Sequence, residues 1–499
     1  MWPFQKKQST PPAIVPLEPW NLSTPLLWFS SNDNWNISNA IEGTLVLGAT
    51  GSGKTSGSGR ELALALLYEG FGGLVLTAKS DERALWESYC REAGRLNDLL
   101  VFGPAESLRF NFLDFELQRK GVGAGLTENI VNLFSTVLEI AERNSGKGGR
   151  EDEGYWRRAN RQLCRNLVDL LVLARGRISV PDLYRLVITA PISMDQIRSV
   201  EWKEKSFLFR CLAEADKQPK TPQRLRDFEI VADYFLLEYP TLSDKTRSVI
   251  VSTFTSMVDV LNRGILRELF CTDTNVTPEV CQGGEIILID LAVKEFAEIG
   301  QFAQVLWKYA FQRSIERRDV TTSPRPVFLW ADEAQHFVTS YDSMFQTTCR
   351  SARVATVLLS QNVSNFYAAF GGNERGKAEA DSLFGNLNTK IFHANGDPVT
   401  NQWASTLIGR TRQFFVNASS SNQGADWMSA ISGFGETPQT SSGVSESYEF
   451  DVQPSAFTSL RTGGPAHYGT VDSIVFQNGK VFKASGKNWL PTSFRQKRQ

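Results

Sequence analysis

Gly48-Ala-Thr-Gly-Ser-Gly-Lys-Thr55 is the stretch that decides the fold of this 499-residue chain. It matches the P-loop pattern G-x-x-x-x-G-K-[ST]. The glycines let the backbone wrap closely around phosphate oxygens, and the N–H groups at the start of the following helix supply a positive field. Lys54 is predicted to reach the β- and γ-phosphates of ATP, and the Thr55 hydroxyl to bind Mg²⁺. The predicted ATP-binding residues are Gly48, Ala49, Thr50, Gly51, Ser52, Gly53, Lys54 and Thr55.

The segments around the P-loop have the pattern of an α/β sheet, which argues against a chance glycine-rich turn. Thr44–Leu47 is a short apolar run bounded by glycines, typical of a buried parallel strand. A helix is expected from Lys54 to Tyr68, and further strands at Gly73–Thr77 and Leu99–Phe102. This alternation of strand and helix predicts the α/β class with a parallel sheet.

A second motif supplies the acid that a P-loop hydrolase needs. The apolar run Pro326–Ala331 predicts a buried strand, and Asp332 and Glu333 follow at its carboxyl end, where parallel sheets bind ligands. We expect Asp332 to hold Mg²⁺ through water and Glu333 to act as general base toward the attacking water. An ordinary solvated Asp-Glu pair is the alternative. Asp290 ends another apolar strand and is a rival acid, although no Glu follows it.

The strand predicted over Ala355–Ser360 ends at Gln361, which is well placed to sense the γ-phosphate. A strand-end glutamine without a role is the alternative. The catalytic residues are thus predicted to be Lys54, Asp332, Glu333 and Gln361. Four arginines near these strands are candidates for an arginine finger that acts in a neighbouring subunit, although each alone is more often a solvated charge. They are Arg350, Arg353, Arg410 and Arg412.

The strand pattern nearly disappears between Glu116 and Phe270, where apolar residues follow helical periodicity. This stretch predicts an all-helical insertion. Between Arg143 and Arg226 it holds 18 Lys and Arg against 10 Asp and Glu, a net charge of +8. Such a balance suits contact with DNA phosphates, and a solvated helical face is the alternative.

Sheet character returns at Gly284–Leu291 and continues toward the C-terminus. The stretch 417–447 is rich in Ser, Gly, Gln and Asn, which predicts a long loop. Val471–Phe476 and Lys480–Ala484, joined through Gln-Asn-Gly, predict a closing hairpin. The predicted boundaries are 1–42 for an irregular lead-in, 43–115 and 276–486 for the two parts of a nucleotide-binding domain, 116–275 for the helical insertion and 487–499 for a basic tail.

Composition narrows the class of protein. The 53 Lys and Arg and the 54 Asp and Glu give a formal net charge of −1, which argues against a protein that coats nucleic acid by bulk charge. The sequence has no run of about 18 apolar residues, so no transmembrane helix is predicted. The six cysteines are scattered without a CxxC pair, which indicates reduced thiols in a reducing compartment.

The order of these motifs resembles that of the FtsK/HerA-like motor ATPases. More narrowly, the chain resembles the type IV secretion coupling proteins, the TraG/TraD-type conjugative DNA transfer ATPases. The helical insertion between the two halves of the nucleotide-binding domain supports the resemblance, which covers roughly residues 40–486. The segments that carry it are Gly48–Thr55, Arg109–Leu113, Asp332-Glu333, Ser360-Gln361, Lys390–Gly409 and Pro454–Gly464.

The resemblance implies a RecA-like P-loop motor domain with an inserted all-α domain, usually assembled as a homo-hexamer. It implies ATP-driven movement of DNA, or of relaxase-bound DNA and secretion substrate proteins, into a conjugation or type IV secretion apparatus. By position, Lys54 and Thr55 would bind phosphate and Mg²⁺, and Gln361 would sense the nucleotide. Asp332 and Glu333 would handle metal and water.

The chain departs from the family at its N-terminus. Members typically begin with a transmembrane anchor, whereas here about 42 residues precede the first strand and none is predicted to span a bilayer. We therefore expect a soluble, cytoplasmic relative, either peripheral at the inner membrane through a separate membrane-anchored partner or moving DNA without secretion. Two other functions stay open: a motor that delivers polypeptide substrates on the same fold, and a nucleotide-gated assembly scaffold. Glu333 argues against the scaffold, which needs no catalytic base.

Overall fold

The structure is a computed structural model, and it describes residues 19–144, 153–420 and 440–496. A nine-stranded sheet has the order β13-β12-β9-β3-β8-β7-β4-β6-β5. The strands from β9 to β5 are parallel to one another, and β12 pairs antiparallel with both β9 and β13. The strands are β3 (Thr44–Leu47), β4 (Gly72–Leu76), β5 (Leu99–Phe102), β6 (Ile286–Ile289), β7 (Val327–Ala331), β8 (Val354–Ser360), β9 (Thr389–Phe392), β12 (Thr470–Gln477) and β13 (Trp489–Arg495).

Both faces of the central strands are buried, which explains why these strands are continuous apolar runs rather than alternating ones. In β3, Leu45 and Leu47 pack on one face and Val46 on the other. Three helices cover the Val46 face: α1 (Ile37–Ile41), α2 (Arg60–Tyr68) and α3 (Glu82–Glu92). The opposite face is covered by α15 (Val293–Glu316), α16 (Ser340–Thr348), α17 (Val363–Ala369), α18 (Glu374–Asn386) and α19 (Pro398–Ile408).

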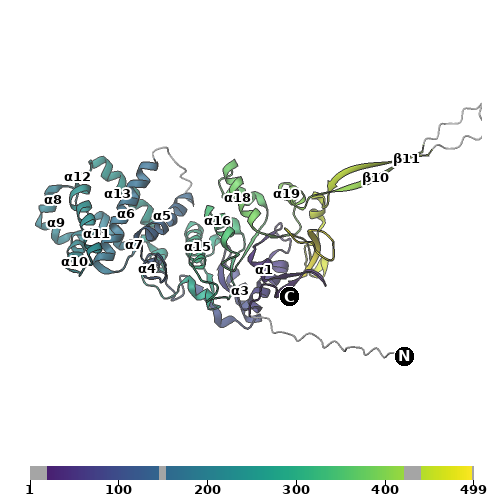
Figure 1. The fold of residues 1–499 in the computed structure, drawn as a ribbon, viewed down its shortest axis with the longest axis horizontal. Coiled ribbons are helices and arrows are strands. Elements are labelled where there is room, and N and C mark those ends of the chain that lie inside the picture. The colour runs from purple at the N-terminus through teal and green to yellow at the C-terminus, as the bar shows by residue number, and fades with distance from the viewer. Residues whose placement is uncertain (1–18, 145–152, 421–439, 497–499) are drawn as a thin grey trace, which may run out of the picture.

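Between β5 and β6 the described chain is helical, and these helices form the opposite end of the elongated molecule (Figure 1). Many of them begin at a Ser or Thr whose side chain accepts a hydrogen bond from the first helical turn, as at Ser179, Ser206 and Ser243. The helices are α4 (Phe112–Gln118), α5 (Thr127–Asn144), α6 (Glu153–Arg175), α7 (Val180–Ile188), α8 (Met194–Arg198), α9 (Val200–Lys205), α10 (Phe207–Lys217), α11 (Pro222–Asp233), α12 (Tyr239–Thr241), α13 (Asp244–Val258) and α14 (Gly264–Phe270). The predicted class, a parallel α/β sheet interrupted by helices, is confirmed.

An aromatic cluster joins the sheet to the helical end. Trp307 of α15 is fully buried and stacks on Phe110, with ring centroids 4.3 Å apart. Phe102, at the end of β5, contacts both Trp307 and Phe270 of α14. One continuous hydrophobic core therefore extends from the sheet into the helices.

Four sequence predictions need correction. The lead-in is not wholly irregular, because β1 (Pro25–Trp28) pairs with β2 (Asn34–Asn36). The stretch 417–447 is not simply a loop, because β10 (Arg410–Ser420) pairs with β11 (Thr440–Phe450) in a ribbon that projects from the body (Figure 1). Residues 421–439 lie outside the described part.

The other two corrections concern the C-terminus. The antiparallel partner of β12 is β13, whereas the predicted partner Lys480–Ala484 is not a strand. Within the segment 487–499, predicted as a basic tail, Trp489–Arg495 therefore forms an edge strand of the main sheet. The Gln-Asn-Gly sequence suggested a tight hairpin with the residues directly after it. The actual strand contains Pro491, which argues against a strand in general but is tolerated in an edge strand such as β13.

Within the described residues, no single helix is long and apolar enough to cross a membrane. One bent pair, Asp244–Asn262 with Gly264–Phe270 at 81°, passes the same test of length and composition when taken together. All six cysteines are buried as free thiols.

We expect Trp307→Ala to lower the free energy of unfolding by about 3–5 kcal/mol, because it leaves a cavity where the sheet meets the helices. Trp28→Ala is the matched control, since that side chain is 57% exposed, and should change stability by no more than about 0.5 kcal/mol. Chemical denaturation followed by circular dichroism measures both. Equal losses in the two variants would contradict this role for Trp307.

Candidate nucleotide-binding site

The P-loop lies between the end of β3 and the start of α2. Gly48 is in close contact with the rest of the loop, because a β-carbon there would lie 2.5 Å from Ser52 Oγ. Gly53 has a φ of +82°, in the left-handed region that favours glycine. The turn Thr55–Gly59 is π-helical, with its last N–H donating to the Lys54 carbonyl over 2.8 Å. Single π-helical turns are frequent at functional sites.

The strand order places the polar strand ends side by side. β3, β8, β7 and β4 are consecutive in the sheet and parallel. Each strand leads into a polar segment at this carboxyl edge. The P-loop follows β3, Gln361 follows β8, Asp332-Glu333 follows β7, and Lys79 lies just after β4. Motifs far apart in the sequence thus meet at one edge of the sheet, where ligands of open parallel sheets bind.

The P-loop and the β7 end are in direct contact. Thr55 Oγ1 donates a hydrogen bond of 2.7 Å to Asp332 Oδ2. Asp332 is only 3% exposed, and its other oxygen accepts the Glu333 N–H at 2.8 Å. The Asp332 carboxylate is therefore fixed at both oxygens, beside the hydroxyl that the motif predicts as a metal ligand.

Glu333 occupies the centre of the site. Its backbone is left-handed (φ 49°, ψ 48°), an uncommon conformation for a residue other than glycine. Its carboxylate lies 3.7 Å from Lys54 Nζ and 3.5 Å from Lys79 Nζ, and it accepts a 3.0 Å hydrogen bond from Gln335 Nε2. Gln361 Nε2 lies 3.4 Å from both of its oxygens.

These neighbours keep Glu333 ionised. Burial raises the pKa of Glu333, but the Gln335 hydrogen bond and the charges of Lys54 and Lys79 outweigh this effect and hold that pKa below its usual value. A carboxylate that is ionised at neutral pH and lies beside Lys54 can accept a proton from water.

Three residues near Glu333 were missed by the sequence analysis. Gln335 is itself anchored by Ser360 Oγ, which donates to its Oε1 over 2.7 Å. Burial lowers the pKa of Lys79, but the charges of Asp332 and Glu333 raise it overall, so Lys79 is a second cation beside the P-loop. Burial, then repulsion from Asp332, raises the pKa of Glu82 to about 8. Strand-end position could have indicated Lys79, whereas no sequence pattern indicates Gln335 or Glu82.

A cleft of about 980 Å³ extends from this cluster along the P-loop. Residues Ala49–Ser56 form its floor, and α3 forms one wall. The C-terminal region also lines the cleft, through Gly464, Pro465, Tyr468, Gly469 and Gln496. The cleft is large enough for a nucleoside triphosphate, and its cationic lining residues are Lys54, Arg60 and Lys79.

The oxygen atoms around the P-loop suit Mg²⁺. Thr55 Oγ1 and an Asp332 oxygen are hard ligands, 2.7 Å apart, and Asp332 is buried while Thr55 is partly exposed. No group of three or more His, Cys, Asp or Glu side chains that could hold a metal occurs among the described residues. A metal bound by one hydroxyl and one carboxylate takes its remaining ligands from water and substrate phosphates, as Mg²⁺ usually does.

None of the four candidate finger arginines lines the cleft of its own chain. Arg353 is half-buried and donates to the Pro324 carbonyl. Arg350 and Arg412 form ion pairs with Glu42 and Glu446, while Arg410 lies over the Phe450 ring. If one of the four contacts a nucleotide, it does so in another subunit.

Comparison with known proteins adds to this geometry. Residues 326–449 match the family model described as the TraM recognition site of TraD and TraG. The solved structure of the bacterial conjugative coupling protein TrwB, in its unbound form, is 16% identical, with a TM-score of 0.57 over 92% of this chain and 86% of that one. The predicted resemblance to TraG/TraD-type coupling proteins is confirmed.

Two further TrwB structures carry nucleotides. The complex with the GTP analogue GDPNP is 15% identical, with a TM-score of 0.57 over 93% of this chain and 88% of that one. The complex with ADP and Mg²⁺ is 14% identical, with a TM-score of 0.56 over the same shares. These likenesses establish the fold, which is the RecA-like α/β domain with helical insertion that we predicted. No curated protein matches the chain in sequence.

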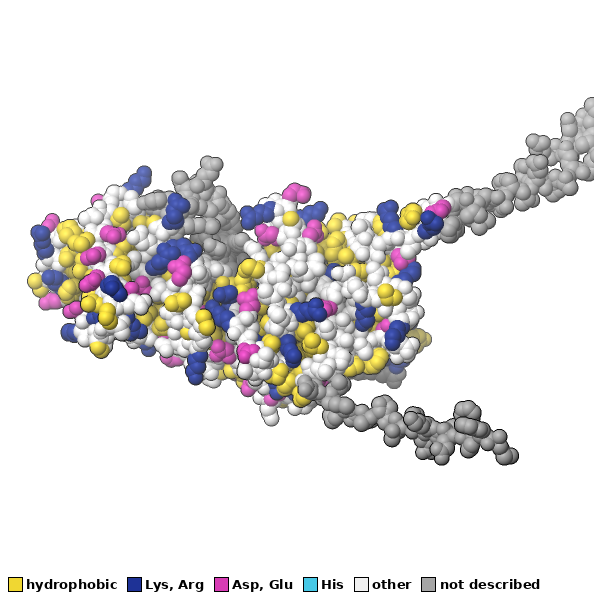
Figure 2. Space-filling view, in the orientation of Figure 1, with side chains coloured by type: hydrophobic (Ala, Val, Ile, Leu, Met, Phe, Trp, Pro, Cys, Tyr) yellow, Lys and Arg dark blue, Asp and Glu magenta, His cyan; other side chains and the backbone are white. Residues whose placement is uncertain are grey.

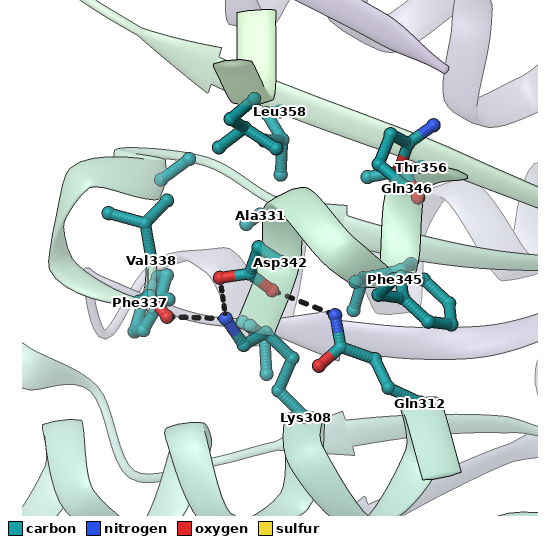
Figure 3. A pocket seen from close by; sticks show the side chains of 14 residues that line it. Lys308, Gln312, Ala331, Phe337, Val338, Asp342, Phe345, Gln346, Thr356 and Leu358 are labelled. Carbon is teal, nitrogen blue, oxygen red and sulfur yellow. Dashed lines mark hydrogen bonds and ion pairs between the residues drawn. The ribbon is translucent and has the colours of Figure 1, made fainter. Parts of the chain in front are cut away.

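On this coupling-protein fold, a buried ion pair fixes the segment that follows Glu333. Lys308 of α15 donates to the Phe337 carbonyl over 2.6 Å and forms an ion pair with Asp342 (Figure 3). Gln312, one turn further along α15, donates to the other Asp342 oxygen at 2.7 Å. The Thr339 N–H also donates to Asp342. The chain after β7 is therefore tied to α15 by a charge that is shielded from water.

We expect Lys308→Met to lower the free energy of unfolding by about 3–5 kcal/mol, because it leaves the Asp342 charge buried without its cation. Lys308→Met combined with Asp342→Leu should recover much of the loss, since neither charge is then buried. The control is Lys205→Met, which breaks an exposed ion pair with Glu201 and should have little effect. Urea denaturation measures all three, and equal effects of the two single variants would contradict the assignment.

Proposed function

We propose that the protein is an ATP-hydrolysing motor of the conjugative coupling type, which moves DNA or relaxase-bound DNA toward a conjugation or type IV secretion apparatus. The observation that carries the proposal is the contact between Thr55 and Asp332, with Glu333 facing Lys54 at the end of a cleft. The likeness to TrwB, solved with nucleotides and Mg²⁺, supports the proposal.

The P-loop is proposed to bind the phosphates of ATP. Residues Ala49–Thr55, including Lys54, line the cleft, and free N–H groups of this loop together with the Lys54 ammonium would neutralise phosphate charge. Thr55 and Asp332 would hold Mg²⁺, which when bound supplies Lewis-acid stabilisation of phosphate charge. Lys79 adds a second ammonium on the same side and is proposed to contact the terminal phosphate.

Glu333 is proposed to act as the general base. Its carboxylate would accept a proton as water attacks the terminal phosphate, and its lowered pKa keeps it ionised for that role. Gln335, anchored by Ser360, holds one of its oxygens, while Gln361 reaches both over longer distances. Gln335 is therefore proposed to orient the base, and Gln361 to sense the nucleotide.

A ring assembly, most simply a homo-hexamer, is proposed to complete the site. An arginine from a neighbouring subunit would add charge stabilisation to the transition state, as an arginine finger does. Arg350 and Arg412 suit this role best, because their side chains are 67% and 54% exposed. Arg410 is also exposed, whereas Arg353 is engaged within its own chain.

The partners are proposed to be DNA and relaxosome or secretion substrate proteins, with a separate membrane-anchored protein at the inner membrane. Residues 326–449 match the segment described as recognising TraM in TraD and TraG, which favours a protein contact there. On the face in Figure 2, Lys and Arg of the helical end are interspersed with Asp and Glu. DNA contact is therefore proposed for another face or for the inner surface of the ring.

We expect Lys54→Ala to lose ATP binding, and Glu333→Gln to bind ATP but hydrolyse it at least about 100-fold more slowly, because a general base contributes about 10²–10⁴-fold. Steady-state phosphate release and fluorescent-nucleotide binding measure the two effects. Glu201→Gln is the matched control at an exposed carboxylate and should leave both unchanged. Full ATPase activity in Glu333→Gln would refute the assignment of the base.

We expect single- or double-stranded DNA to stimulate the steady-state ATPase activity, with the stimulation fading as salt rises, because phosphate contacts release counterions. The Lys54→Ala protein, purified in parallel, sets the background from contaminating enzymes. Robust activity that is indifferent to DNA at every salt concentration would contradict a DNA motor and favour polypeptide substrates.

A further inference from the structure

We propose that Tyr468 forms a nucleobase subsite, in which its ring stacks on the purine of a nucleotide whose phosphates lie on the P-loop. The inference rests on the proposed function, because it takes the P-loop cleft to be a nucleotide site. It gives a role to the part of the cleft lining that no motif explains, which comes from α3 and from the C-terminal loop Gly464–Gly469.

The cleft is lined by two kinds of side chain. Lys54 and Lys79 line it and both contact Glu333. Leu85 and Tyr89 of α3, with Tyr468 of the C-terminal loop, add apolar and aromatic surface to the same cleft. Such surface suits a flat, largely apolar ring, whereas it offers little to a phosphate.

The loop that carries Tyr468 is fixed by hydrogen bonds. The Gly469 N–H donates to the Gly464 carbonyl and the Gln496 N–H to the Gly469 carbonyl, both over 2.8 Å. The Gln496 side chain accepts the Gly464 N–H at 2.7 Å and donates to Ser56 Oγ, beside the P-loop, at 2.6 Å. These hydrogen bonds hold the loop beside the P-loop.

Two features of Tyr468 are relevant to ligand binding. Its side chain is 96% exposed, although tyrosine rings usually bury much of their area. Its backbone is left-handed (φ 52°, ψ 35°), which is a strained conformation for a bulky residue. Local strain that is held by surrounding hydrogen bonds is typical of ligand-binding positions. The left-handed residue ends the turn Pro465–His467, and a base stacked on the ring would cover the side chain that the turn presents.

The subsite is expected to recognise the face of the base rather than its hydrogen-bonding edge. Several polar side chains that line the cleft already interact within the chain. Gln496 forms hydrogen bonds with Ser56 and Gly464, and Arg60 forms an ion pair with Glu92. Stacking tolerates any base, because every base has a π-face. ATP and GTP should therefore bind with similar affinity.

The test is calorimetric titration of the full chain with three probes: ATP, GTP and inorganic tripolyphosphate, each with Mg²⁺. We expect Tyr468→Ala to weaken ATP and GTP about 5- to 150-fold, the range for loss of one base–aromatic stack, and to leave tripolyphosphate binding unchanged. Tyr468→Phe keeps the aromatic face and should bind ATP as the wild-type chain does. Lys54→Ala should weaken all three probes.

Four outcomes would overturn the subsite. The first is an unchanged ATP affinity in Tyr468→Ala, and the second is an equal loss of affinity for ATP and for tripolyphosphate in that variant. The third is a strong preference for ATP over GTP, or the reverse, that persists in Tyr468→Ala. The fourth is a change in sedimentation of Tyr468→Ala without a change in nucleotide binding, which would make Tyr468 an interface residue. If Lys54→Ala weakens none of the three probes, the proposed nucleotide site itself fails, which is a distinguishable result.

Discussion

The hydrogen bond from Thr55 to Asp332 is the contact on which the rest of the site depends. It joins the P-loop after β3 to the acidic motif after β7, although β8 lies between these two strands. The hydroxyl and the carboxylate thus meet across the carboxyl end of β8. Gln361, at the end of β8, is thereby placed between the two motifs and within reach of Glu333.

The α15 helix is the second structural constraint. Its polar side chains point at the edge of the sheet where the site lies: Gln304 accepts the Thr77 N–H over 2.8 Å, and Lys308 holds the chain after Glu333. From the same helix, Trp307 packs against Phe110 near the helical insertion. The same helix thus contacts the chain after β4, the chain after β7 and Phe110 beside the helical insertion.

The sequence predicted the local motifs well and the long-range contacts poorly. Lys54, Asp332, Glu333 and Gln361 end or follow apolar strands, so their types and positions were readable, and the structure brings them together. Gln335 and Lys308 act only through contacts between distant segments, for which no periodicity exists. The edge strand β13 was missed because Pro491 and the surrounding charges resemble a tail. The β10/β11 ribbon was missed because the stretch 417–447 is rich in Ser, Gly, Gln and Asn, a composition typical of loops.

The central claim is that Thr55 and Asp332 together hold Mg²⁺ for a nucleotide on the P-loop. It is tested most directly by measuring the affinity for ATP with Mg²⁺ and with EDTA, in the wild-type chain and in Thr55→Val, which keeps the shape of the side chain but removes its oxygen. We expect wild-type affinity to fall when Mg²⁺ is removed, and Thr55→Val to bind ATP equally weakly under both conditions. Full retention of the Mg²⁺ dependence in Thr55→Val would contradict the account.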